Sequence, residues 1–326
     1  MKTKILTLLR NSQDYISGQE LCDAMGVSRT AIWKVMNQLK EEGYEIVAIQ
    51  NKGYKLVSYP DVLSASEIGS RLKGKWTGSE IHFFQETGST NNDAKKMAEE
   101  GCKNGTLIVA NRQLAGRGRR GRTWESPADT SVYMTLVLRP TFPPAKASML
   151  TLVMALSATK ALEEITGLLV KIKWPNDIII NNKKICGILT EMNAEPDFIH
   201  YVVIGMGTNV NMNSFPEELA DKASSLKIET GRTVNRTQVI AKVMEYFEEV
   251  YESFLQTLDL TLLMEEYNAH LANKDARVKV LDPKEEFEGI ARGINEFGEL
   301  IVEKENGEIT LVFAGEVSVR GIYGYL

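Results

Sequence analysis

Four arginines lie within the seven residues GRGRRGR at 116–122, inside the longer segment QLAGRGRRGRTWESP at 113–127. Positive charges this close repel one another, and a loop of glycine and arginine has little reason to become ordered alone. An anion would remove both problems, because glycines let the backbone approach a phosphate and guanidinium groups bind its oxygens in pairs. Trp124 adds an aromatic face for a base. The composition therefore predicts a loop that binds a phosphate-bearing nucleotide.

Two other interpretations of this loop were weighed. Gly116, Gly118 and Gly121 fit the dinucleotide pattern G-x-G-x-x-G, which must follow a strand and open a helix. A proline-containing stretch and then another strand follow instead, so this interpretation fails. Single-stranded nucleic acid remains a competing ligand. A groove that binds a nucleic-acid strand usually has several basic and aromatic residues along its length, whereas this segment has one basic patch with one aromatic residue. The ATP-binding pattern G-x-x-x-x-G-K-[ST] is absent from the sequence.

A second polar cluster lies in VKIKWPNDIIINNKKICGIL at 170–189. Strand alternation places Lys171 and Lys173 on one side, and Pro175 ends that strand before a turn. Four side chains are then able to converge at one edge: Lys173, Asn176, Asp177 and Lys184. Spacing alone favours a surface hairpin with solvated lysines. The polar stretches TGSTNN at 87–92 and GMGTNVN at 205–211 also follow expected strands, and helix caps or turns explain them equally well.

Composition limits the class of protein. The chain has 326 residues, 43% of them hydrophobic, and a formal net charge of −5, which describes a globular protein of two or three domains. Three scattered cysteines and three scattered histidines argue against a disulfide framework, a zinc site and a histidine-based triad. The N-terminus does not resemble a leader, and no apolar run reaches the ~18 residues of a membrane span. We expect a cytoplasmic protein without a membrane partner.

The first segment predicts a DNA-binding module. Helices are expected at 4–10, 18–25 and 29–43, with Ser17 and Glu20 forming a capping box and Ser28 capping the third helix. A hairpin at 44–57 adds a wing, and residues 1–60 carry a slight positive charge. The third helix has no acidic residue from 28 to 40. The expected DNA contacts are Arg29, Thr30, Lys34, Asn37 and, at the wing tip, Lys52. A helical domain for protein contacts is the alternative.

The rest of the chain predicts an α+β fold. Expected helices lie at 64–73, 90–101, 146–167, 237–258 and 260–271, and expected strands at 79–87, 105–113, 130–140, 168–174, 177–181, 184–192 and 198–207. This order fits a mixed, mainly antiparallel sheet flanked by helices better than strict β-α-β alternation. From about residue 275 short strands and tight turns indicate a small SH3-like β-barrel.

Five motifs carry a resemblance that covers the whole chain: ETGSTN, RQLAGRGRRGRTW, KIKWPNDIII, KKICGILTEM and GMGTNVN, in this order and spacing. With the winged helix before them and the β module after them, the sequence resembles the bifunctional biotin–protein ligases that also repress the biotin operon. The resemblance implies a DNA-binding domain at 1–62, a catalytic domain of the class II biotin/lipoate ligase type at 63–273 and an SH3-like domain at 274–326.

Members of that family make biotinyl-5′-AMP from biotin and ATP with Mg²⁺, and then transfer biotin to a lysine of a carboxylase's biotin carrier domain. The resemblance implies biotin contacts by Ser89, Thr90, Asn91, Gln113, Gly116, Arg117, Gly118, Arg119 and Lys184. It implies ATP or adenylate contacts by Arg117, Arg119, Arg122, Trp124, Lys173, Asn176 and Asn209. Arg119, Lys184 and Asp177 are the expected catalytic residues, and Asp177 is a candidate Mg²⁺ ligand or base for the incoming lysine. The family also implies an adenylate-bound homodimer that binds operator DNA.

Two alternatives stay open at this point. A lipoate ligase of related fold is disfavoured by the arginine loop, the KWPND stretch and the winged helix. A regulator that senses biotin without catalysis would keep the same modules. Pyrophosphate exchange that depends on biotin rather than lipoate distinguishes a biotin ligase from the lipoate ligase. Biotinylation of a carrier domain distinguishes an enzyme from a regulator that only senses biotin.

Overall fold

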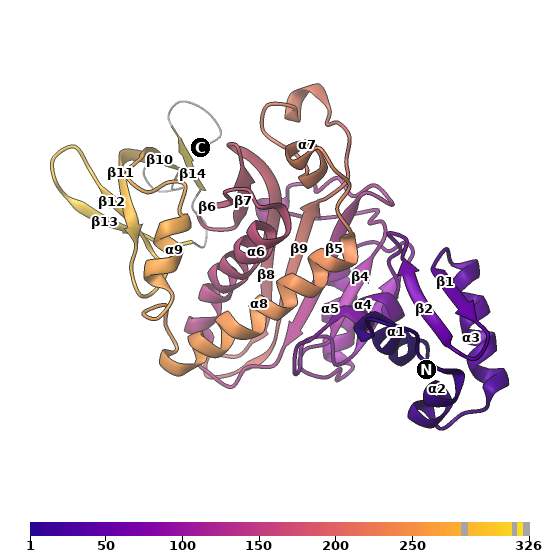
Figure 1. The fold of residues 1–326 in the computed structure, drawn as a ribbon. Helices are drawn as coiled ribbons and strands as arrows, with labels where there is room; N and C mark the ends of the chain where they lie inside the picture. The colour runs from indigo at the N-terminus through magenta and orange to yellow at the C-terminus, as the bar shows by residue number, and fades with distance from the viewer. Residues whose placement is uncertain (282–285, 315–317, 322–326) are drawn as a thin grey trace. The chain divides into compact units, whose positions relative to one another are not determined.

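A computed structural model describes residues 1–281, 286–314 and 318–321 (Figure 1). The chain forms two compact units. One consists of Met1–Leu72 together with the short segment Asn235–Gln238, and the other of Lys73–Val234 with Val239–Leu326. Among the described residues, no helix is long and apolar enough to cross a membrane.

The first unit is a helix-turn-helix with a wing. Helices α1 (Lys2–Asn11), α2 (Gly18–Met25) and α3 (Arg29–Glu41) precede the antiparallel hairpin of β1 (Glu45–Ile49) and β2 (Gly53–Ser58), and α4 (Ala65–Arg71) follows. The capping box is confirmed: Ser17 Oγ accepts from the Glu20 N–H at 3.1 Å, and the Glu20 carboxylate accepts from the Ser17 N–H at 2.7 Å. The predicted stripe of α3 is buried in the core of this unit: Ile32, Val35, Met36 and Leu39.

A buried carboxylate ties the first and last helices of this unit together. Glu67 of α4 is 0% exposed. It accepts hydrogen bonds from Arg10 of α1 at 2.9 and 3.0 Å, from the Tyr44 hydroxyl at 2.8 Å and from Arg71 at 2.6 Å. Both guanidinium groups also lie over the Tyr59 ring, at 4.6 and 4.3 Å from its centroid. One anion therefore compensates two partly buried cations.

We expect Glu67→Gln to lower the free energy of unfolding of this unit by about 3 kcal/mol, because removing one partner leaves the other charges buried without compensation. Amide hydrogen exchange of α1 to α4 measures the effect. Glu45→Gln is the matched control, since Glu45 is exposed and its carboxylate accepts a hydrogen bond from the Ser58 hydroxyl at 2.9 Å. Equal protection in the two variants would contradict the prediction.

The second unit is built on a seven-stranded sheet in the order β3-β4-β5-β9-β8-β7-β6. Its strands are β3 (Ile81–Phe84), β4 (Leu107–Ala110), β5 (Ser131–Leu138), β6 (Lys171–Lys173), β7 (Asp177–Ile180), β8 (Lys183–Ala194) and β9 (Ile199–Asn209). Only β3 and β4 pair in parallel within this sheet, and the other neighbours are antiparallel. The mixed, mainly antiparallel sheet is confirmed.

Helices flank this sheet. The helix α5 (Thr90–Glu99) packs on β4, β5 and β9, and α6 (Leu150–Thr166) packs on β6 to β9. Three further helices follow the sheet in the chain: α7 (Leu226–Thr230), α8 (Arg236–Thr257) and α9 (Met264–His270) (Figure 1). Two predicted boundaries were wrong. The helix expected at 146–167 starts as a 3-10 turn, η2 (Pro144–Met149), and the helix expected at 260–271 begins only at Met264, after a turn.

The C-terminal strands form a separate five-stranded antiparallel sheet in the order β13-β12-β11-β10-β14. Its strands are β10 (Arg277–Leu281), β11 (Glu286–Ile294), β12 (Leu300–Glu303), β13 (Ile309–Val312) and β14 (Ser318–Gly321). The Trp174 indole N–H donates to the Gly298 carbonyl at 3.1 Å, so this small sheet is joined to the segment that follows β6.

Candidate functional site

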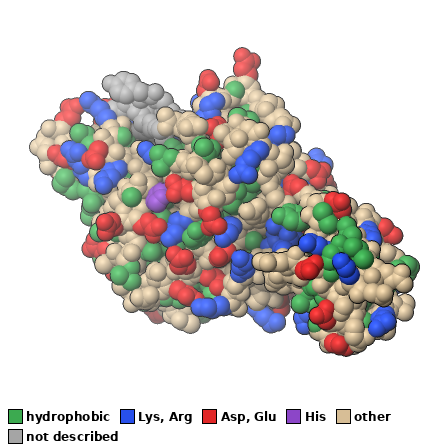
Figure 2. Space-filling model, in the orientation of Figure 1, with side chains coloured by type: hydrophobic (Ala, Val, Ile, Leu, Met, Phe, Trp, Pro, Cys, Tyr) green, Lys and Arg blue, Asp and Glu red, His purple; other side chains and the backbone are tan. Residues whose placement is uncertain are grey.

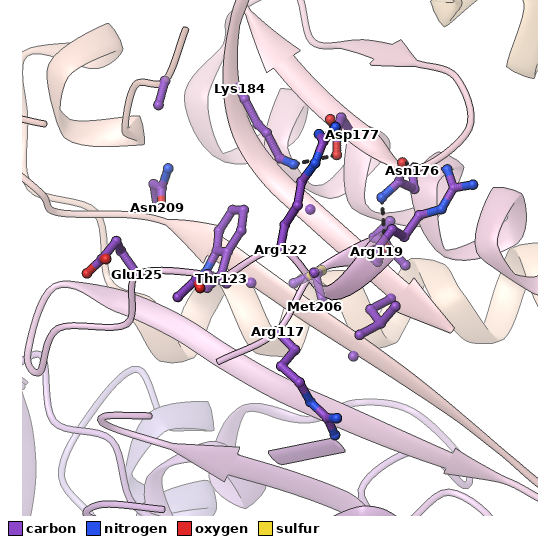
Figure 3. A pocket seen from close by; sticks show the side chains of 18 of the residues that line it. Arg117, Arg119, Arg122, Thr123, Glu125, Asn176, Asp177, Lys184, Met206 and Asn209 are labelled. Carbon is purple, nitrogen blue, oxygen red and sulfur yellow. Dashed lines mark hydrogen bonds and ion pairs between the residues drawn. The ribbon is translucent and has the colours of Figure 1, made fainter. Parts of the chain in front are cut away.

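The residues expected to bind small molecules gather around one cavity of about 720 Å³ (Figure 3). Those that line it are Ser89, Thr90, Asn91, Gln113, Arg117, Gly118, Arg119, Arg122, Trp124, Lys173, Asn176, Asp177, Lys184 and Asn209. They come from the start of α5, the arginine loop, the strands β6, β7, β8 and β9, and the turn between β6 and β7. Gly116 is the single residue of the predicted set that does not line the cavity.

Gly116 instead lets two backbone segments approach closely. Its carbonyl accepts from the Trp124 N–H at 2.9 Å, and an added Cβ would lie 2.6 Å from both the Trp124 carbonyl oxygen and the Ser126 hydroxyl. Further along, the Gly118 N–H donates to the Arg122 carbonyl at 2.8 Å. The loop thus closes on itself around one 3-10 turn, η1 (Arg119–Gly121), and no α-helix follows it. Exclusion of the dinucleotide-loop interpretation is confirmed.

Arg119 is a partly buried arginine of this loop. Its guanidinium donates to the Asn176 side-chain oxygen at 3.2 Å and to the Ala314 carbonyl. Burial is the main cause that lowers the pKa of Arg119; Asp177 opposes the shift, and Arg120 and Arg122 add to it. The group stays charged at neutral pH, since arginine titrates far above it. An anionic ligand would stabilise this partly buried cation.

The predicted convergence of lysine and aspartate is present. Lys184 Nζ lies 2.6 Å from Asp177 Oδ1, across the antiparallel pair β7–β8. The same ammonium lies 5.2 Å from the centroid of the Trp124 ring. Figure 3 shows Arg122 pointing toward this pair and Arg117 pointing away from it. Arg117 donates to the Asn92 side chain. Lysine and arginine side chains outnumber carboxylates around the cavity, which is lined by seven of the former and by Glu125, Asp177 and Asp221. This excess of positive charge suits a ligand carrying more than one negative charge.

Trp124 lies flat against the sheet because two glycines leave room for its ring. A Cβ added at Gly207 would lie 2.6 Å from Trp124 Cε2 and Nε1, and one added at Gly187 would lie 3.1 Å from Cζ3. These glycines occupy facing positions on β8 and β9. The indole N–H is buried and has no hydrogen-bond partner among the described residues. Small residues at both positions therefore determine where the aromatic face lies.

We expect Gly207→Ala to raise the Kd for ATP about 10-fold, because the indole must move and base–aromatic stacking contributes about 1–3 kcal/mol. Isothermal titration with a non-hydrolysable ATP analogue measures it. Gly88→Ala is the control, since a Cβ there would meet no atom within 4 Å. In a Trp124→Ala background the Gly207 change should add little. An undiminished effect in that background would sink the explanation.

The start of α5 forms the other wall. Gln113 Oε1 accepts from the Thr90 N–H at 3.0 Å and from the Thr90 hydroxyl at 3.1 Å. The Asn91 carboxamide is fully used within the protein: its oxygen accepts from Thr135 at 2.7 Å, and its nitrogen donates to Glu191 at 2.8 Å and to the Leu189 carbonyl at 3.3 Å. Asn91 therefore shapes the cavity wall in this structure, while Ser89, the N-cap of α5, makes no side-chain cap bond.

Sequence reasoning assigned no role to Glu191, although it lies in the motif KKICGILTEM. Its carboxylate bonds to Asn91 and pairs with Lys95 at 2.5 Å. Burial raises the pKa of Glu191, but hydrogen bonds from Lys95 and Asn91 outweigh burial and lower it overall. Glu191 stays ionised and orients the Asn91 amide.

A second group missed by sequence reasoning lies after β9. The cavity is also lined by Met212, Phe215, Leu219 and Lys222. The Lys184 N–H donates to the Lys222 carbonyl at 2.8 Å, and the Ser224 N–H donates to the Lys184 carbonyl at 3.0 Å, which fastens this segment to the start of β8. The only feature of the sequence that could have indicated this part of the cavity is the occurrence of isolated apolar residues in the polar stretch after β9.

The expected DNA-contact residues lie on the surface of the first unit. Arg29, Thr30, Lys34 and Lys52 are exposed, and Asn37 is partly exposed. Arg29 donates to the Gln19 side chain of α2 at 3.0 Å, so its guanidinium is held near the turn between the two helices.

Comparisons with known proteins match each part of the chain. The family model described as the biotin/lipoate A/B protein ligase family matches residues 81–209. A helix-turn-helix domain model matches residues 2–55, and the biotin protein ligase C-terminal domain model matches residues 276–320.

Full-length relatives carry the same three parts. A bifunctional ligase/repressor of Bacillus subtilis is 40% identical over 310 residues and covers 94% of each chain, and one of Escherichia coli is 31% identical over 97% of this chain and 96% of that one. The structure of an Aquifex aeolicus biotin protein ligase in complex with biotin and ATP matches with a TM-score of 0.66 and 30% identity, covering 74% of this chain and 99% of that one. On this evidence, the chain belongs to the bifunctional ligase/repressor family of biotin protein ligases.

Proposed function

We propose that this chain joins biotin to ATP, forming biotinyl-5′-AMP, and transfers the biotinyl group to a lysine of a carboxylase's biotin carrier domain. The observation that carries the proposal is one cavity in which the arginine loop, the Lys184–Asp177 pair and the Trp124 face meet. We also propose a cytoplasmic location, because the proposed reaction uses ATP and the proposed repression needs access to operator DNA.

In the first half-reaction the biotin carboxylate attacks the α-phosphorus of ATP, and pyrophosphate leaves. Two anions must approach each other, so positioned cations are needed to screen them and to stabilise charge on the phosphate oxygens. We assign this role to Lys184 and Arg119, with Arg117, Arg122 and Lys173 as further cations at the cavity. Trp124 offers the stacking face for adenine, beside the side chains of Asn176 and Asn209.

Mg²⁺ is part of this proposal. Among the residues that the structure describes, no group of three His, Cys, Asp or Glu side chains is arranged to hold a metal. Mg²⁺ bound with nucleotides often takes only one or two carboxylates and otherwise phosphate oxygens and water, so the Asp177 carboxylate fits as its protein ligand. When bound, the ion would neutralise charge on the ATP phosphates.

In the second half-reaction the lysine amine of the carrier attacks the carbonyl carbon of the mixed anhydride, and AMP leaves. The protein must mainly keep water from the anhydride until the carrier docks. The arginine loop and the segment with Met212, Phe215 and Leu219 both line the cavity and are suited to cover the adenylate. We keep residues 1–62, 63–273 and 274–326 as the proposed limits of the three domains.

The second proposed activity is repression. The adenylate-bound chain forms a homodimer that binds the biotin operator through α3 and the wing. A ligand that orders loops at an interface supplies the free-energy difference that such a switch requires.

The test uses purified full-length chain with ATP, Mg²⁺, a biotin carrier domain and either biotin or lipoate. Biotin-dependent pyrophosphate exchange and biotinylation of the carrier are expected. Exchange with lipoate alone would favour the lipoate ligase, and ligand binding without transfer would favour a regulator that only senses biotin. Operator binding insensitive to biotin and ATP would remove the proposed switch.

A further inference from the structure

We propose that Trp33 reads sequence in the DNA major groove by placing its indole against the methyl group of a thymine. This inference rests on the proposed repressor function and adds a specificity-determining residue to it. The indole is 59% exposed on α3, although tryptophan is among the most costly side chains to leave in water.

Helical geometry places Trp33 on the outward face of α3. The inward stripe is Ile32, Val35, Met36 and Leu39, all buried. At about 100° per residue, Trp33 falls on the opposite half of the helix, between Arg29 one turn before and Asn37 one turn after. Thr30, three residues earlier, lies beside it. Of the four helix positions one turn away from Trp33, only Met36 is apolar, and it is buried in the stripe. The exposed neighbours on α3 are polar or basic, so the tryptophan is an isolated apolar side chain on this helix surface.

Charge on this face favours a polyanion. No acidic residue occurs from Ser28 to Lys40, and Lys34 and Lys40 are exposed. A protein partner would instead prefer contiguous apolar surface. This unit has such a surface elsewhere, on the wing, where Val47, Ile49 and Val57 are exposed and Figure 2 shows hydrophobic side chains gathered over β2. The lone indole on α3 therefore fits DNA better than protein.

The chemistry of the groove selects the base. The edge of the major groove is made of hydrogen-bond donors and acceptors, and its one apolar group is the C5 methyl of thymine. An indole buried in the groove can therefore make a favourable apolar contact with that methyl group. Asn37 and Thr30 beside it carry the groups that bond to the adenine edge. The geometry therefore points to an A·T-containing step under the middle of α3.

The experiment starts from a duplex selected out of a randomised library by the wild-type chain with biotin and ATP. Each thymine is then replaced singly by deoxyuridine, which removes only the methyl group. For the wild-type chain, we expect substitution at one position in each half-site to weaken binding about 5-fold. Trp33→Ala should weaken binding to the unmodified duplex about 10-fold or more and make it insensitive to deoxyuridine at that position.

Leu169→Ala is the matched control, because Leu169 is an exposed apolar side chain of the second unit, outside α3 and the wing; it should keep the wild-type response. Circular dichroism and biotin transfer should be unchanged in Trp33→Ala. The inference is overturned if no thymine is sensitive in the wild type, if Trp33→Ala keeps the sensitivity, or if it abolishes dimerisation while DNA contacts persist. Failure of the wild-type chain to select any duplex would overturn the repressor proposal itself.

Discussion

Replacing Lys184 by methionine is expected to reduce biotin-dependent pyrophosphate exchange by about 10³-fold, a loss typical of removing a group that stabilises developing charge. Methionine keeps much of the length and the apolar stem of lysine but lacks its charge. In the structure that charge lies 2.6 Å from Asp177 and 5.2 Å from the centre of the Trp124 ring. Without it, the biotin carboxylate and the α-phosphate would meet with weaker screening.

Lys183→Met is the matched control. Lys183 is the preceding residue on β8, but its ammonium donates to the Ala220 carbonyl at 3.1 Å and does not line the cavity. It should keep near wild-type exchange. Because Lys184→Met removes the ion pair between Lys184 and Asp177, thermal unfolding of the variant should be measured alongside activity. A folded Lys184→Met enzyme with wild-type exchange would refute the assignment of Lys184.

Arg119→Ala is expected to shorten the lifetime of bound adenylate about 100-fold, since hydrogen bonds to charged groups contribute about 1.5–3 kcal/mol each. Burial lowers the pKa of Arg119, so a phosphate beside this partly buried cation would stabilise its charge. The substitution also removes the links from the loop to Asn176 and Ala314, so the loop should close less tightly over the ligand.

The lifetime is measured by loading the chain with biotin and ATP, removing free ligand and following release of biotinyl-5′-AMP by chromatography. Operator binding should be lost at the same rate, because the proposed dimer depends on the bound adenylate. Arg112→Ala is the control: Arg112 is exposed and pairs with Glu86 at 2.9 Å, away from the cavity. If both variants released adenylate at the wild-type rate, Arg119 would have no part in retention.

Local features of this protein were predictable from its sequence. The capping box of Ser17 and Glu20 and the buried stripe of α3 depend on residues three or four positions apart. A short stretch of sequence therefore contains all the residues that form them. The order of strands and helices predicted the mixed sheet, and the five spaced motifs predicted the family and the set of residues around the cavity.

Tertiary structure decided the contacts that depend on strand register and on distant segments. Asp177 and Lys184 pair because β7 and β8 are antiparallel, and Trp124 lies flat because Gly187 and Gly207 face each other across β8 and β9. The bonding of the Asn91 amide to Glu191, 100 positions away, and the burial of Glu67 against Arg10 also had no local signal. The sequence alone therefore predicted most of the helices and strands and the candidate site residues, although the starts of two helices were wrong. Only the folded chain determined which side chains meet, because a register shift of one residue would turn each strand's side chains to the opposite face.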